Sequence, residues 1–249
     1  FLGCPIRMIL RLGGGDLNAL FGIAGFAGGI GFGTIFLKRG YSLQRTYALS
    51  KLESAMMPAI QVGLLVLVVT APAFIFFSQK GPGAMHAPWL ISLAAGLVVG
   101  GLSQFSRLCT VGGFRDLFLF KKSILIFGYL AVLIGVFVVN ISFGNFHLGF
   151  ENQPIAHTDG LWNFLGMALA GFCSVLLGGC PLRQLIMTGE GNSDSAVTVL
   201  GLGAGAAFAH NFGLAASGAG PTLNGEIAVG VGFVVAFIIA VVNTKRANA

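Results

Sequence analysis

The sequence predicts an all-α polytopic membrane protein, and three observations support this fold class. Apolar residues make up 55% of the 249 residues and charged residues only 9%, whereas a typical soluble domain has about 25% charged residues. Several uncharged segments have about 20 residues, the length that a helix needs to cross a bilayer. Glycine occurs 39 times, and in the first of these segments it recurs at every fourth position, as in closely packed membrane helices. We therefore expect one transmembrane domain covering residues 1–249.

The charged residues and cysteines exclude several other classes of protein. The formal net charge is +6, but lysine and arginine lie in short loops and beside the cysteines, which indicates membrane topology and attraction of anions, not nucleic-acid binding. Four cysteines are too few for a secreted disulfide scaffold. No pair of them has the spacing of a zinc site. We expect the lipid bilayer as the surroundings, with no metal, cofactor or nucleic acid.

The first 16 residues are too short to cross a membrane. We expect a turn at Cys4, a short half-helix that begins at Pro5, and a glycine loop before Asp16. The chain begins at Phe1, inside this motif and without an initiator methionine or signal peptide. We therefore expect further residues to precede it in the natural protein.

Seven longer apolar segments are predicted to span the membrane. The first carries Gly25, Gly29 and Gly33 on one face, where a neighbouring backbone can approach closely. The second contains Pro58 near its start and Pro72, where a kink is expected. The predicted spans are Leu17–Leu37, Met57–Ser78, Pro88–Phe105, Ile124–Phe143, Leu161–Gly178, Ala196–Ala215 and Glu226–Asn243.

The remaining segments are short helices and loops. Cys109–Lys122 and Pro181–Met187 are predicted non-spanning helices, and Glu190–Ser195 a polar loop. Basic residues concentrate in loop 38–54 and in the C-terminal tail. By the positive-inside rule these two face the cytoplasm, and loops 79–88 and 144–160 face outward.

An internal repeat organises the chain. The segment Gly3-Cys4-Pro5-Ile6-Arg7 recurs as Gly179-Cys180-Pro181-Leu182-Arg183. Five predicted spans separate the copies, and an odd number inverts the second copy relative to the first; one span more or fewer would make the repeats parallel. The predicted halves are 1–87, incomplete at its N-terminus, and 88–249. Inverted repeats with interrupted helices are typical of transporters whose site lies between the repeats. Further matching pairs are Gly13/Gly189, Gly15/Gly191, Gly25/Gly201 and Gly29/Gly205.

The cysteine segments are predicted to bind an anion. Proline favours the first position of a helix, so Cys4 and Cys180 lie at helix N-termini, where free N–H groups and the helix dipole attract anions and favour a thiolate. The arginine three residues later lies on the same side. Around Cys109, Thr110 can donate a hydrogen bond and Asp116 is expected to orient Arg115. The candidate binding residues are Cys4, Cys109, Cys180, Arg7, Arg115 and Arg183.

Other reactive residues have simpler interpretations. Cys173 has no arginine nearby and is interpreted as a packing residue. His210 and Asn211 lie in an apolar span, where a polar pair usually hydrogen-bonds a neighbouring helix; ligand contact is the alternative. Charges near the cytoplasmic interface are Arg107, Lys121 and Lys122, and histidines interpreted as loop residues are His86, His147 and His157.

At these motifs the sequence resembles the YeeE/YedE family of sulfur-transport membrane proteins, most closely the YedE-type branch, described as selenium transporters. The resemblance rests on segments 109–116, 179–185 and 189–193 and covers essentially the whole chain. It implies half-helices that meet at a constriction, where cysteines pass thiosulfate by S–H···S contacts. Matching motifs assign this role to Cys4, Cys109 and Cys180. The family's first-half copy of the Cys-x-x-Gly-Gly-x-Arg-Asp segment would precede Phe1.

The predicted function is transport of a small sulfur- or selenium-containing anion, thiosulfate-like or a selenium species, across the inner membrane. The alternative is a membrane-embedded sulfurtransferase that passes persulfide sulfur to a small cytosolic sulfur-carrier protein. A third interpretation, a structural or assembly subunit, accounts for the glycines but not for the repeated cysteine–arginine segments.

Overall fold

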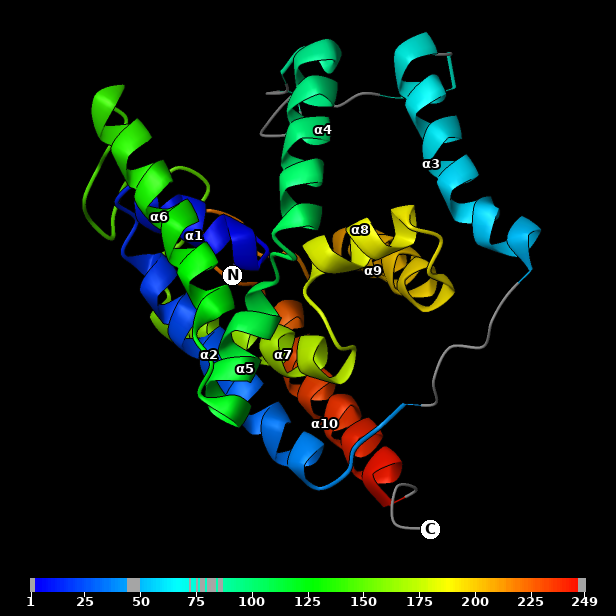
Figure 1. Ribbon diagram of the computed structural model, residues 1–249. Coiled ribbons are helices and arrows are strands. Elements are labelled where there is room, and N and C mark those ends of the chain that lie inside the picture. The colour runs from blue at the N-terminus through cyan, green and yellow to red at the C-terminus, as the bar shows by residue number, and fades with distance from the viewer. Residues whose placement is uncertain are drawn as a thin grey trace.

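The computed structural model describes residues 3–43, 50–71 and 87–245, with only 73–74, 76, 79 and 84 between the last two ranges. These residues form an all-helical fold without a β-strand, which confirms the predicted fold class (Figure 1). The helices are α1 (Pro5–Gly13), α2 (Asn18–Lys38), α3 (Lys51–Thr70), α4 (Trp89–Phe105), α5 (Thr110–Phe120), α6 (Ile124–Ser142), α7 (Gly160–Leu176), α8 (Pro181–Gly189), α9 (Ser193–Asn211) and α10 (Leu223–Lys245).

Five segments of the described chain are long and apolar enough to cross a membrane, so the protein is a multi-pass membrane protein. They are α2, α4 with α5, α6, α7 with α8, and α10. Seven spans were predicted; the second, Met57–Ser78, runs into residues outside the described ranges, so the count of five applies to the described residues alone. The apolar part of α3 covers only Ala55–Thr70, and α9 has polar residues at both ends, beginning at Ser193 and ending at Asn211.

Two predicted loops are shorter than expected because the next helix starts earlier. Helix α3 already begins at Lys51, inside the predicted loop 38–54, and α9 begins at Ser193, inside the predicted loop 190–195. The side chain of Asn192 caps α9 by accepting a hydrogen bond from the Ser195 N–H at 2.9 Å. The predicted kink at Pro72, His86, most of loop 79–88 and the final residues lie outside the described residues.

The core of the fold is the pair α2 and α7, which run parallel and make the most extensive helix–helix contact. A Cβ atom added at Gly25 would lie 2.1 Å from the Phe164 carbonyl oxygen, and one at Gly29 would lie 1.9 Å from that of Ala168. Only glycine permits this approach, which confirms the predicted packing face. Phenylalanines of α2, α7 and α10 then pack edge to face around the C-terminal end of the pair.

The outer helices present apolar side chains to their surroundings. Only 6% of the residues in the apolar stretch of α6 are buried, against 44% in α2. Figure 1 shows α3 and α4 projecting from one side of the molecule, and α8 and α9 packed beside each other. Side chains such as Leu97 and Ile134 are more than half exposed there. Such surfaces suit lipid hydrocarbon, because apolar residues lose nothing by facing it.

Candidate functional site

The three predicted half-helices are present, and each begins directly after a cysteine. Cys4, Cys109 and Cys180 have extended backbones and occupy the N-cap positions of α1, α5 and α8. Pro5 and Pro181 take the first helical positions, where the missing proline N–H costs no hydrogen bond. The Cys109 Sγ accepts a hydrogen bond from the Gly112 N–H at 3.3 Å. Three thiols therefore lie at the positive ends of short helices.

Two of these helix ends meet in the protein interior. The thiols of Cys109 and Cys180 lie within interaction distance of each other in one buried cluster, and the Arg183 backbone N–H also lies near the Cys180 sulfur. Cys180 is 1% exposed. Both cysteines belong to a buried apolar cluster that also contains Met8 of α1 and Met167 of α7. The interior around the thiol pair is therefore rich in polarisable sulfur.

The third cysteine opens onto a cavity on the other side of this cluster. Cys4 is exposed and lines a cavity of about 730 Å³ together with Arg7 and Arg11. We call this the first cavity. Its opposite wall is formed by the segment between α6 and α7, including Asn145, His147, Asn152 and Gln153.

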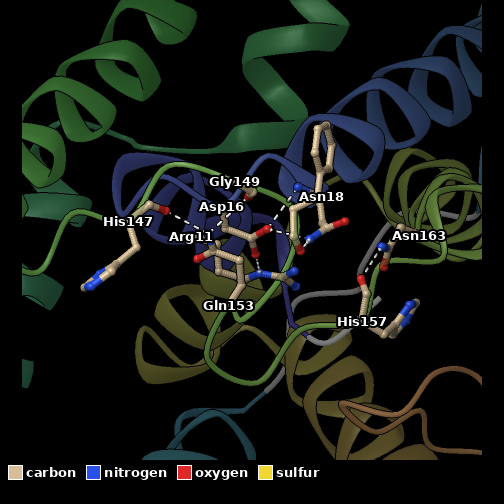
Figure 2. A network of polar contacts seen from close by, with 9 residues as sticks. Arg11, Asp16, Asn18, His147, Gly149, Gln153, His157 and Asn163 are labelled. Carbon is tan, nitrogen blue, oxygen red and sulfur yellow. Dashed lines mark hydrogen bonds and ion pairs between the residues drawn. The ribbon is translucent and has the colours of Figure 1, made fainter.

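A buried polar network fixes this wall (Figure 2). The Arg11 Nε donates to Asp16 Oδ2 at 2.6 Å, and the Asn18 side chain donates to Asp16 Oδ1 at 2.9 Å. Segment 147–153, named the strap here, lies on the α1–α2 turn. The His147 N–H donates to the Gly14 carbonyl at 2.9 Å. The sequence did not predict the Arg11–Asp16 pair, although a charged pair beside three glycines was a usable signal.

A second cavity lies beyond the thiol pair. It has a volume of about 700 Å³, and its lining includes Tyr41, Arg115, Asp194 and the turn at Leu177–Gly178 that precedes Cys180. The Tyr41 hydroxyl donates to the Leu176 carbonyl at 3.3 Å. Burial is the main cause that raises the pKa of this tyrosine, and the nearby Cys173 sulfur raises it further. Cavities therefore flank the cysteine cluster at two ends.

The three candidate arginines have different partners. Arg7 lines the first cavity beside Cys4. Arg115 forms an ion pair with Asp116 at 2.9 Å, as predicted, and lines the second cavity. The Arg183 Nη1 donates to Gln104 Oε1 of α4 at 2.7 Å, and Gln104 in turn bonds to Glu190. The Arg183 guanidinium therefore binds α4 and not the neighbouring thiol. Sequence patterns did not indicate this contact with α4.

The other polar residues lie away from the thiol pair. Cys173 packs against a separate apolar cluster around Phe172 and Leu176. His210 is exposed, and Asn211 donates to the Ala207 carbonyl of its own helix at 2.8 Å, not to a neighbouring helix as predicted. His157 lies in a loop as predicted but is only 3% exposed. Among the described residues, no cluster of three or more His, Cys, Asp or Glu side chains could hold a metal.

A comparison with protein families identifies the family of the chain, because the match covers more than half of it. The family described as sulphur transport matches residues 105–245, which include α5, α8 and both buried cysteines. No curated protein matches the chain. No solved structure matches it either.

Proposed function

Because the chain belongs to the sulphur transport family, we propose that it carries a small sulfur- or selenium-containing anion through a path lined by Cys4, Cys109 and Cys180. We place it in the inner membrane with its C-terminus in the cytoplasm. The path runs from the first cavity, past Cys4 and the Cys109–Cys180 pair, to the second cavity. Arg7 and Arg115 draw the anion into the two cavities, and Arg183 holds α8 against α4.

The thiol contact between Cys109 and Cys180 is the observation that carries this proposal. It brings together two helix N-termini that are far apart in the sequence. Helix N-termini offer N–H groups and partial positive charge to an anion. The thiols and the nearby methionines add weak S–H donors and polarisable atoms. In this structure the two thiols lie close together in one buried cluster, so they must separate for an anion to pass.

Burial of the thiols favours transport over sulfur transfer. A sulfurtransferase must expose its persulfide to the acceptor protein, but Cys180 is 1% and Cys109 9% exposed. A small cytosolic sulfur-carrier protein could receive the anion's sulfur only after release on the cytoplasmic side. No covalent step is needed for the transport reaction that we propose.

Uptake by proteoliposomes tests the proposal. The full-length protein should accumulate labelled thiosulfate or a selenium analogue, and Cys109→Ala and Cys180→Ala should each reduce uptake about tenfold or more, the usual loss for a hydrogen bond to a charged group. Cys173→Ala is the matched control and should keep wild-type uptake. Equal loss in all three variants would contradict the path, as folding would then be the common cause.

Intact-protein mass spectrometry of the same samples separates transport from sulfur transfer. A transporter shows unmodified cysteines after exposure to thiosulfate without reductant. One added sulfur atom per protein on Cys180, without intact anion inside the vesicles, would establish the sulfurtransferase instead.

A further inference from the structure

We propose that Gln104 is a positioning residue that holds Cys109 and Cys180 together, and that release of its side chain lets the two thiols separate. This inference rests on the proposed function and deepens it, because it names a contact that must break when the anion passes. Gln104 contains neither sulfur nor charge, and the function proposed above assigns it no part in opening the path.

The side chain of Gln104 uses both of its polar ends on one short helix. Its Oε1 accepts a hydrogen bond from Arg183 Nη1 at 2.7 Å, and its Nε2 donates to Glu190 Oε1. Arg183 lies in the first turn of α8, and Glu190 is the residue that follows its last turn. Gln104 therefore joins α4 to both ends of α8, through a cation and an anion, and hydrogen bonds to charged groups are the stronger ones.

Each side of this contact is connected directly to one of the two thiols. Helix α4 leads into α5 through a short turn, in which the Leu108 N–H donates to the Ser103 carbonyl at 3.0 Å. Cys109 follows this turn as the N-cap of α5. On the other side, Cys180 is the N-cap of α8 itself. A displacement of α4 relative to α8 therefore moves Cys109 relative to Cys180.

Few other contacts within the described chain fix the end of α4 that carries Gln104. Ser103 is the buried residue of this helix, while Leu102 is 64% and Phe105 90% exposed. Figure 1 shows α4 projecting away from α8, with its C-terminal end nearest to that helix. Segments with few buried apolar contacts are the ones that move at low cost. The hydrogen bonds of Gln104 therefore contribute much to the position of α4.

The position of α4 matters because the thiol pair is closed in this structure. Cys180 is 1% and Cys109 9% exposed, and both belong to one buried apolar cluster. When the form that binds a ligand is only a minor population, the apparent affinity is reduced by that fraction. Loss of the Gln104 contact raises the fraction of open protein and should tighten apparent binding. Ordinary damage to a transport path would weaken it.

Thiol labelling of the full-length protein with N-ethylmaleimide, without substrate, tests the contact. Gln104→Leu removes both hydrogen bonds and should raise the labelling rates of Cys109 and Cys180 about tenfold, the usual effect of losing a hydrogen bond to a charged group. Peptide mass spectrometry measures each cysteine separately. Cys173 packs against a different apolar cluster and should keep its wild-type labelling rate.

A second glutamine provides the matched control. Gln61 of α3 lies beside the other side of α8, with its Oε1 3.7 Å from the place of a Cβ atom added at Gly189. Gln61→Leu is the same chemical change next to the same helix, but outside the contact with Arg183 and Glu190. It should leave the labelling rates of all cysteines unchanged.

An exchange of charge identifies the contact itself. Gln104→Glu keeps an acceptor for Arg183 but places a carboxylate against Glu190, so the like charges repel and labelling should accelerate as in Gln104→Leu. Adding Glu190→Gln removes the repulsion and supplies an amide that can donate to the new carboxylate. This double variant should return to the wild-type labelling rate, because the effects of residues in direct contact are coupled.

Thiosulfate uptake by the same variants supplies the functional measurement. Gln104→Leu should lower the half-saturating thiosulfate concentration about tenfold, and the double variant should restore the wild-type value. Unchanged labelling of Cys109 and Cys180 in Gln104→Leu, or equal acceleration at Cys173, would overturn the inference. A higher half-saturating concentration despite faster labelling would refute the role in opening. Absence of uptake by the wild-type protein would refute the proposed function, while labelling would still decide whether Gln104 holds the thiols together.

Discussion

Single side chains in this fold differ in how completely their polar atoms are paired. The ion pair of Arg11 and Asp16 is buried and further bonded through Asn18. Close to it, His157 is 3% exposed, and neither ring nitrogen has a hydrogen-bond partner among the described residues. Its carbonyl accepts from the Asn163 side chain at 3.1 Å (Figure 2). A buried imidazole without partners makes its loop sensitive to protonation.

We predict that His157 lowers the stability of the protein at acidic pH. Burial lowers the pKa of this histidine below its ordinary value of 6.5; the Arg11 guanidinium acts in the same direction and the Asp159 carboxylate against it. The unfolded chain therefore binds the proton more readily. The stabilisation is complete above pH 6.5 and decreases as pH falls through 6.5 towards the lower pKa of the folded state.

Thermal unfolding between pH 7.5 and pH 5 measures this effect. His157→Gln should show a smaller loss of unfolding temperature on acidification than the wild-type protein. His147→Gln changes an exposed histidine of the same loop and should behave as the wild type. An identical pH dependence in His157→Gln and wild type would refute the prediction.

At the scale of helices, local sequence signals determined where elements begin but not which elements meet. The proline after Cys4 and Cys180 predicted the starts of α1 and α8, and the glycines of α2 predicted close packing. The family resemblance implied that the cysteine-bearing half-helices meet, but local sequence signals did not indicate that Cys109 and Cys180 are the two that adjoin, because this depends on how α5 and α8 pack in three dimensions. The same holds for the bond from Arg183 to Gln104.

The repeat itself shows this limit. Gly29 and Gly205 occupy equivalent positions in the two copies, yet a Cβ at Gly29 would lie 1.9 Å from the Ala168 oxygen, whereas a Cβ at Gly205 would meet no atom within 4 Å outside the backbone of its own helix. Equivalent sequence thus stands in different surroundings. A single sequence carries no information on which copy has a neighbour, since glycine spacing is the same in both.

We predict opposite effects of alanine at these two positions. Gly29→Ala pushes α2 away from the α7 backbone and should cost about 1–3 kcal/mol or more of unfolding free energy. Gly205→Ala meets open space and should gain about 0.5–1 kcal/mol, the usual advantage of alanine over glycine inside a helix. Thermal unfolding in detergent measures both variants. A similar loss at both positions would contradict the contact of α2 with α7.

At the scale of the whole molecule, α2 sets the two faces of the protein. Its 21 residues extend about 30 Å, the thickness of the hydrocarbon core. The strap bonds to the N-terminal end of α2, where Asn18 Nδ2 donates to the Phe150 carbonyl at 2.7 Å.

Lys38 and Arg39 lie at the C-terminal end of α2. There Phe36 and Tyr41 pack with Ala240 from the C-terminal half of α10. The strap is therefore on the opposite side of the bilayer from both the basic loop and the end of α10.

We predict that the strap faces outward and that the loop after α2 faces the cytoplasm with the C-terminus. The positive-inside rule gives the sign, because Lys38 and Arg39 favour the cytoplasmic side. Single cysteines at the exposed positions Glu151 and Ser42, in a background without the native cysteines, should react differently with a membrane-impermeant thiol reagent. Glu151→Cys should react on intact cells, and Ser42→Cys only after the membrane is opened. The reverse pattern would invert the orientation, and labelling of both from outside would contradict α2 as a membrane span.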